Sequence, residues 1–152
     1  MTPGSVRRML ESDVLHVALV EEESFDGDAG STSLSESDLL AELARPWARL
    51  WVYDRRVPLG FMLVWHVADE LHVHNVAVHP QHRRQGIARA LMNEVTRYMN
   101  EFGVSRSWLE VRKSNDAARR LYESFGYEVV GERAAYYADG EDALEMAWIR
   151  SA

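Results

Sequence analysis

The sequence contains no cysteine. This absence excludes a disulfide framework, a thiolate metal site and a cysteine nucleophile, so any covalent catalysis would need another side chain. No apolar run approaches the roughly 18 residues of a membrane helix, and no basic and then apolar segment opens the chain. We therefore expect no membrane span and no export, and we expect a cytoplasmic protein.

Positive charge is scarce as well. The 17 lysines and arginines are outnumbered by 24 aspartates and glutamates, which gives a formal net charge of -7. This balance argues against direct binding to nucleic acid, and it mildly favours a cationic substrate or a basic partner.

Composition and length indicate one soluble globular domain. Of the 152 residues, 47% are hydrophobic and 27% are charged, which is ordinary for such a domain. The chain contains no internal repeat and no stretch with the composition of an interdomain linker. We therefore predict a single domain over residues 1–152, and we expect a monomer.

Hydrophobic periodicity predicts the order of strands and helices. An antiparallel hairpin is expected where two apolar runs flank the short turn at residues 55–58. Helix N-caps are expected at Ser12, at Ser35, and at Ser114 or Asn115. We expect about seven strands and about four helices, the strands at residues 6–10, 48–54, 59–68, 71–78, 108–111, 127–137 and 143–149, and the helices at residues 13–22, 35–45, 87–102 and 115–125.

The third expected helix has the clearest amphipathic pattern. Its apolar residues Ile87, Leu91, Val95, Tyr98 and Phe102 recur at steps of three or four. Residues at this spacing share one face of a helix, so we expect them all to be buried.

The segment from Arg83 to Ala88, with the sequence RRQGIA, lies between an expected strand and this helix. Cations at a helix N-terminus oppose the macrodipole, unless a bound phosphate pairs with them and accepts hydrogen bonds from the free backbone N–H groups. The segment therefore predicts a phosphate site. An ordinary, exposed basic helix start is the alternative.

The RxxGxA pattern at this junction, together with the order of elements, resembles the GCN5-related N-acetyltransferase (GNAT) family over nearly the whole chain. The resemblance implies a single α/β (α+β) domain, with a mixed, mostly antiparallel sheet flanked by helices. It also implies that backbone amides of the pattern bind the pyrophosphate of acetyl coenzyme A. The residues implied for cofactor binding are Val76, Ala77, Val78, Arg83, Arg84, Gln85, Gly86, Ile87, Ala88 and Asn115.

Small residues in the pattern fit this role. A side chain at Gly86 would keep a phosphate from closely approaching the amides, and the small Ala88 allows the same approach. Asn115 is ambiguous, because an asparagine at a helix start serves equally well as an N-cap.

The C-terminal third carries a narrower resemblance. The sequences LEVRKSNDAARRLYESFGY (residues 109–127) and YYADGEDALEM (residues 136–146) are similar to RimI-type ribosomal-protein-alanine N-acetyltransferases and to the catalytic subunit of N-terminal acetyltransferases of type A. Those enzymes acetylate protein α-amino groups. The resemblance therefore implies that the partner is the N-terminal peptide of a protein, with the N-terminal alanine of a ribosomal protein as the first acceptor to try.

Acetyl transfer from a thioester needs a neutral amine. An α-ammonium group has a pKa of roughly 7.7 to 8.0, against about 10.4 for lysine, so a modest base suffices near neutral pH. The resemblance places the general base at Glu110, in the LEVR sequence. The alternative is that Glu110 is a solvated carboxylate at a strand end.

The resemblance places the general acid at Tyr122, twelve positions after Glu110. A phenol with a pKa near 10 can protonate a departing thiolate when assisted, since the reference pKa of a thiol is near 8.5. The alternative is packing, with Leu121, Tyr122 and Phe125 forming the buried face of a helix.

Phe25, Tyr136 and Tyr137 are the expected contacts to the acceptor. The resemblance implies that the paired tyrosines line the peptide groove, although neighbours in an extended strand point to opposite faces unless a bulge intervenes. Two ordinary aromatic strand residues are the alternative. At Phe25 the chain departs from the RimI-type pattern, because Asp26 and Gly27 follow where those enzymes have Pro-Trp-Ser. A small-molecule amine therefore stays open as an acceptor.

No metal is expected. His72 and His74 share one strand face, but no carboxylate or cysteine is placed to complete a ligand set with them or with the nearby His79 and His82. The acidic run at residues 21–23 is expected to be a solvated face, with attraction of a cationic peptide as the alternative. A non-catalytic acyl coenzyme A binding module and a peptide-binding structural module are the alternatives to an enzyme.

Overall fold

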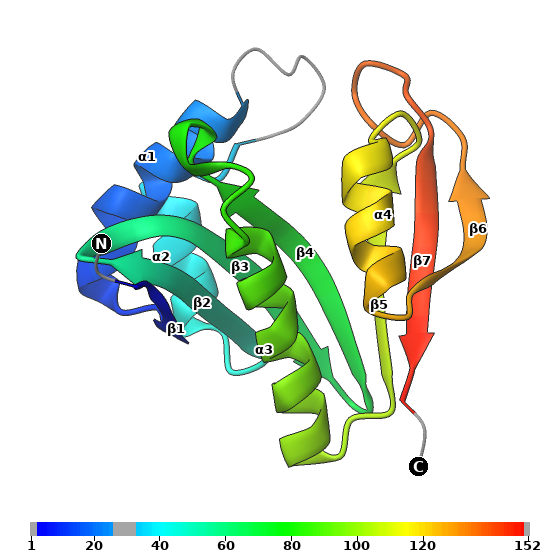
Figure 1. The fold of residues 1–152 in the computed structure, drawn as a ribbon, viewed down its shortest axis with the longest axis horizontal. Coiled ribbons are helices and arrows are strands. Elements are labelled where there is room, and N and C mark those ends of the chain that lie inside the picture. Colours follow the sequence, from blue (N-terminus) through cyan, green and yellow to red (C-terminus); the bar gives the residue numbers. More distant parts are fainter. Residues whose placement is uncertain (1–2, 26–32, 151–152) are drawn as a thin grey trace.

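The computed structural model describes residues 3–25 and 33–150, which form one seven-stranded sheet with helices on both faces (Figure 1). The strand order is β1-β2-β3-β4-β5-β7-β6, and every neighbouring pair is antiparallel except β4 with β5. The predicted mixed, mostly antiparallel sheet is confirmed. The strands are β1 (Ser5–Arg8), β2 (Ala48–Arg55), β3 (Val57–Val67), β4 (Glu70–Val78), β5 (Arg106–Arg112), β6 (Glu128–Arg133) and β7 (Ala143–Ile149).

The helices divide the core into two parts. Side chains of α1 and α2 form one cluster with β2 and β3, and side chains of α3 form the other on the opposite face of the sheet. No helix within residues 3–25 and 33–150 is long and apolar enough to cross a membrane. The helices are α1 (Val14–Phe25), α2 (Glu36–Ala44), α3 (Ile87–Phe102) and α4 (Asp116–Ser124), with short 3-10 turns η1 (Glu11–Asp13) and η2 (Pro80–His82).

The amphipathic pattern of α3 is confirmed at four of its five predicted positions. Ile87, Leu91, Val95 and Tyr98 are buried, whereas Phe102 is 57% exposed. Phe102 lies in the last turn of the helix, where its ring packs on Tyr98 with 4.5 Å between the centroids. The prediction was wrong at Phe102 because the pattern continues one turn beyond the packed part of the helix.

A β-bulge interrupts the pairing of β3 with β4. Leu63 pairs with Asn75, but the next residue, Val64, pairs with Val73, which leaves His74 as the extra residue on β4. A bulge bends its strand and increases the local twist. The bulge therefore redirects the second half of β4.

The bulge also changes which face the side chains of β4 reach. Leu71 and Val73 lie in the core beneath α3, and beyond the bulge Val76 and Val78 pack against that same core. Ala77 packs against the core beneath α1 and α2. The two-residue alternation of the strand is thus shifted by one position.

The pairing of β4 with β5 stops at the bulge. It covers only residues 70–73 of β4 and 106–109 of β5, although β5 continues to pair with β7 as far as Arg112. Beyond this point the two strands diverge in Figure 1. Backbone N–H and C=O groups on the facing edges then have no strand partner among the described residues, and they are free to bind a ligand.

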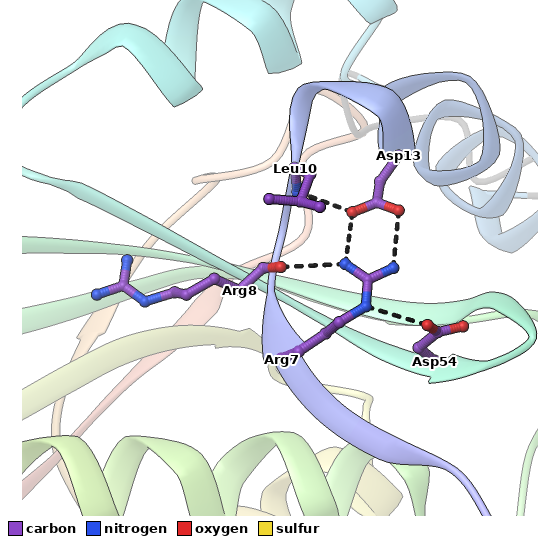
Figure 2. Close-up of polar contacts among 5 residues, drawn as sticks. All are labelled: Arg7, Arg8, Leu10, Asp13 and Asp54. Atoms are coloured by element: carbon purple, nitrogen blue, oxygen red, sulfur yellow. Dashed lines mark hydrogen bonds and ion pairs between the residues drawn. The ribbon is translucent and has the colours of Figure 1, made fainter.

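An arginine fastens the start of α1 to the sheet edge (Figure 2). Arg7 on β1 donates from Nη1 and Nη2 to the two carboxylate oxygens of Asp13, at 2.8 and 2.9 Å, and from Nε to Asp54 at 3.0 Å. The guanidinium holds the pKa of Asp13 below its usual value. Asp13 also accepts from the backbone N–H of Leu10. Asp13 is therefore the capping side chain, and the predicted cap Ser12 was wrong.

Replacing Arg7 with methionine should lower the free energy of unfolding by about 2 kcal/mol, because Asp13 would keep a buried carboxylate without its cation. The side chain of Asp13 is only 9% exposed. The matched control is Arg106→Met, which breaks an ion pair whose side chains are 43% and 46% exposed, and it should cost less than about 1 kcal/mol. Urea denaturation at pH 7 measures both, and equal losses would contradict the account.

Candidate active site

A cleft of about 1210 Å³ opens where β4 and β5 diverge. It is lined by residues of α1, β4, the segment before α3, β5, α4 and the loop before β7. Most of the predicted site residues line it, although the sequence places them far apart: Val76, Ala77, Val78, Arg83, Arg84, Gly86, Ile87, Ala88, Glu110, Asn115, Tyr122, Tyr136 and Tyr137.

Gln85 is not among the described residues that line the cleft. The side chain of Gln85 accepts a hydrogen bond from Arg55 at 3.0 Å instead. Phe25 is the last residue of α1, and its side chain lies outside the described part of the structure, as do Asp26 and Gly27. The predicted acceptor contact at Phe25 therefore stays a prediction.

The RRQGIA segment forms a tight turn that leads directly into α3. Arg84 and Gly86 have positive φ angles of 64° and 80°. A Cβ atom placed on Gly86 would meet nothing within 4 Å, so the space before the helix is open. The first N–H groups of α3, which begin at Ile87 and precede Ala90, have no acceptor within the helix. Open space, free amides and arginines are what a diphosphate requires.

Glu110 is the first residue of β5 beyond its pairing with β4. Its side chain is only 11% exposed, and its Oε2 lies 2.8 Å from Nε2 of His72. The alternative of a solvated strand-end carboxylate was wrong, because the carboxylate is largely buried and held by a neighbouring strand.

Tyr122 lies on α4, where its predicted packing is confirmed and its role as general acid stays a prediction. The side chain packs against the core beneath α3 together with Leu121 and Phe125, and it also lines the cleft. Burial raises the pKa of Tyr122 above its usual value, so the phenol keeps its proton at neutral pH.

Asn115 both caps α4 and lines the cleft. Its side chain accepts the backbone N–H of Ala118 at 3.1 Å, which makes it the N-cap of α4, and it lines the cleft. The predicted cap is confirmed, and contact with a cofactor stays a prediction.

The paired tyrosines lie in a loop instead of a strand. The strand predicted to reach residue 137 ends at Arg133, and Ala135 has a positive φ of 49°. Tyr136 and Tyr137 both line the cleft, and their ring centroids are 5.1 Å apart. The expected alternation was wrong because it assumed an extended strand.

Arg112, at the end of β5, holds this loop. Its guanidinium lies over the ring of Tyr137, 4.1 Å from the centroid, and pairs with Asp139 at 2.9 Å and Glu141 at 3.0 Å. Glu141 also accepts the backbone N–H of Ser114. Burial raises the pKa of Tyr137 to about 12. The loop is thus fixed to β5 beside Glu110 and Tyr122.

Glu21 is a cleft residue that sequence reasoning missed. It was expected to be solvated, yet it is 1% exposed, and it accepts the backbone N–H of Leu34 at 3.1 Å and the side chain of Asn75 at 3.4 Å. The signal was available, because Glu21 follows the buried Val14 and Val17 at helical steps of three and four. Its neighbours at positions 22 and 23 are exposed, as expected.

Two histidines of the described residues contact carboxylates. Within residues 3–25 and 33–150, no group of three histidine, cysteine, aspartate or glutamate side chains could hold a metal ion. His79 contacts Glu23, and His72 contacts Glu110. Each contact brings a single carboxylate to a single histidine, and the expectation that no metal is bound stays a prediction.

Burial raises the pKa of Glu21 to about 7. The folded state thus holds this proton more tightly than the unfolded chain, so the contribution to stability is present below about pH 4.5 and is lost as the pH rises through about 7. Glu21→Gln should therefore match the wild type at pH 4 and exceed its unfolding free energy at pH 8 by up to about 3 kcal/mol. Denaturation at both pH values measures this. The control Glu22→Gln should change little, and a Glu21→Gln effect that is independent of pH would contradict the assignment.

The fold is that of an N-acetyltransferase, the class predicted from the sequence. The model of the acetyltransferase (GNAT) family matches residues 15–127, which is more than half of the chain. The chain therefore belongs to this family of enzymes, which take the acetyl group from acetyl coenzyme A.

The chain is similar to ribosomal protein alanine N-acetyltransferases over part or nearly all of its length. A Bacillus subtilis (strain 168) protein, provisionally named ribosomal protein bS18-alanine N-acetyltransferase, is 35% identical over 150 residues, 97% of this chain and 96% of that protein. The Escherichia coli (strain K12) enzyme of that name is 44% identical over 91 residues, 58% of this chain and 62% of that protein. The crystal structure of the Escherichia coli alanine N-acetyltransferase has a TM-score of 0.87 at 29% identity and covers 98% of this chain and 95% of that chain. This likeness confirms the predicted fold.

Proposed function

We propose that this chain transfers the acetyl group of acetyl coenzyme A to the N-terminal α-amino group of a protein, with the N-terminal alanine of a ribosomal protein as the first acceptor. The observation that carries the proposal is that one cleft is lined by the predicted phosphate-binding segment, by Glu110 and Tyr122, and by Tyr136 and Tyr137. The names of the relatives support the choice of acceptor.

The donor would lie between β4 and β5 where the two strands diverge beyond Val73 and Leu109, a region called the fork below. In this proposal the amides of Arg84 to Ala88 bind the diphosphate, and the free edge at residues 76–78 of β4 pairs with the amide-rich arm of the coenzyme. Asn115, at the start of α4, contacts the coenzyme in this proposal. The bound thioester supplies an electrophilic carbonyl carbon and a thiolate leaving group.

Glu110 acts as the general base. It takes one proton from the α-amine, directly or through a water, and the amine nitrogen forms a bond to the carbonyl carbon. The bond between that carbon and sulfur breaks, and its electron pair stays on sulfur. The transfer passes through a direct ternary complex, which agrees with the absence of cysteine from the sequence.

Tyr122 acts as the general acid and donates its proton to the departing sulfur. Because a phenol is a weaker acid than a thiol by about 1.5 pKa units, full transfer is uphill by about 2 kcal/mol before burial is considered. Burial of Tyr122 raises its pKa further. The phenol therefore first donates a hydrogen bond to the sulfur while charge develops there, and then transfers its proton. Solvent carries the proton from Glu110 to the phenolate, which restores both residues.

The cellular setting belongs to the same proposal. An enzyme that acetylates ribosomal proteins works in the cytoplasm, and we propose that it acts as a monomer without direct contact to nucleic acid or membrane. The net charge of -7 suits a basic partner peptide.

A small-molecule amine is the second candidate acceptor. The departure from the RimI-type pattern at Phe25, Asp26 and Gly27 favours it, because this loop shapes the acceptor site in the enzymes that the chain resembles.

A panel of acceptors separates the two candidates. Mass spectrometry with acetyl coenzyme A should show acetylation of peptides with N-terminal alanine, and none of N-terminally blocked lysine peptides, polyamines or aminoglycosides. The low pKa of an α-amine favours this outcome at pH 7. Acetylation of small amines only would overturn the proposed acceptor.

Glu110→Gln and Tyr122→Phe should each lower kcat on the order of a hundredfold or more, because each removes one proton transfer. Affinity for acetyl coenzyme A, measured by calorimetry, should be retained in both variants. Unchanged turnover in both would contradict the assigned roles. Coenzyme binding without turnover in the wild type would indicate a non-catalytic binding module.

A further inference from the structure

The imidazole of His72 sits in a row of four rings from three neighbouring strands. The ring centroids of Trp65 and His74 are 4.2 Å apart, and those of His74 and His72 are 3.8 Å apart. On its other side His72 stacks on Trp108, at 3.7 Å and with 5° between the planes. Because both faces of the His72 ring are covered, its orientation is fixed.

One edge of this fixed ring contacts Glu110, with 2.8 Å between Nε2 and Oε2. The contact joins β4 to β5 at the end of their pairing, since His72 pairs with Trp108 and only one further pair follows. The two side chains are only 17% and 11% exposed. A hydrogen bond shielded from water in this way holds its partners more firmly than an exposed one.

Glu110 lines the cleft, whereas His72 does not. An ionised carboxylate only accepts hydrogen bonds, so Nε2 of His72 is the atom that carries the hydrogen. Within residues 3–25 and 33–150 the side chain of Glu110 is hydrogen-bonded through Oε2 to His72, so Oε1 is the oxygen left to take a proton. His72 can therefore act on the reaction only through Glu110.

We propose that His72 is a positioning residue for acetyl transfer, whose N–H at Nε2 holds the carboxylate of Glu110 with Oε1 directed at the acceptor amine. The inference rests on the proposed role of Glu110 as general base. A misplacement of about 1 Å in a reacting group costs on the order of a hundredfold in rate. A carboxylate without this bond is free to rotate, so loss of His72 should lower kcat about tenfold or more.

Steady-state kinetics with a peptide acceptor test this proposal. His72→Phe keeps a stacked ring but loses the N–H donor, so kcat should fall while the KM for acetyl coenzyme A stays within about twofold. His72→Gln offers an amide N–H at a similar reach and should recover most of the turnover. The matched control is His66→Phe on β3, which loses a 2.6 Å hydrogen bond to Tyr98 outside the cleft and should keep its kcat.

A double-mutant cycle separates positioning from a merely structural role. In the Glu110→Gln background, His72→Phe should cause little further loss, because the group that His72 positions is already gone. Equal losses in both backgrounds, or full turnover of His72→Phe beside an impaired Glu110→Gln, would overturn this inference alone. Full turnover of Glu110→Gln would overturn the role of Glu110 and the inference together.

Discussion

The pairing of β4 with β5 ends at Val73 and Leu109, and the position of the whole cleft depends on that end. The bulge at His74, which bends its strand, follows immediately on β4, while β5 continues to pair with β7 as far as Arg112. A sheet with continuous pairing would satisfy its own backbone and leave no edge for a ligand. Here the unpaired edges diverge, and α3 and α4 start on either side of the opening (Figure 1). One bulge thus places two helix starts, a carboxylate and a phenol around a single space.

Burial around this opening controls which groups carry charge. Burial lowers the pKa of His74 to about 4 and raises that of Glu21 to about 7, so desolvation disfavours the charged form of both groups. Nε2 of His74 is buried without a hydrogen-bond partner among the described residues, which costs stability. Such costs are typical where function, and not stability, selects the side chain. A cationic acceptor would thus meet Glu110 beside a neutral imidazole.

Short sequence patterns, such as capping residues, correctly predicted the features that depend on residues close together in the sequence. Ser35 and Asp38 form the expected capping box of α2, and Asn115 caps α4. The order of strands and helices along the chain and most element bounds followed from periodicity, and the family resemblance supplied the predicted residues that now line one cleft. The predictions that failed concern features that depend on contacts between different elements of the fold. Nothing in the sequence LHVHNVAV marks a bulge, so neither the fork nor the His72–Glu110 contact was foreseen. The backbone turn at Ala135, which carries Tyr136 and Tyr137 into the cleft, is likewise stabilised by distant partners such as Asp142.

The central claim is that donor and acceptor meet in the fork between β4 and β5. A crystal structure with a bisubstrate analogue, in which coenzyme A is joined through sulfur to the α-amine of an alanine peptide, tests it most directly. The account predicts the diphosphate at the amides of residues 84–88, the linked sulfur between the unpaired edges of β4 and β5, and the peptide beside Glu110 and Tyr136. A diphosphate bound elsewhere, or β4 and β5 paired along their full length, would contradict it.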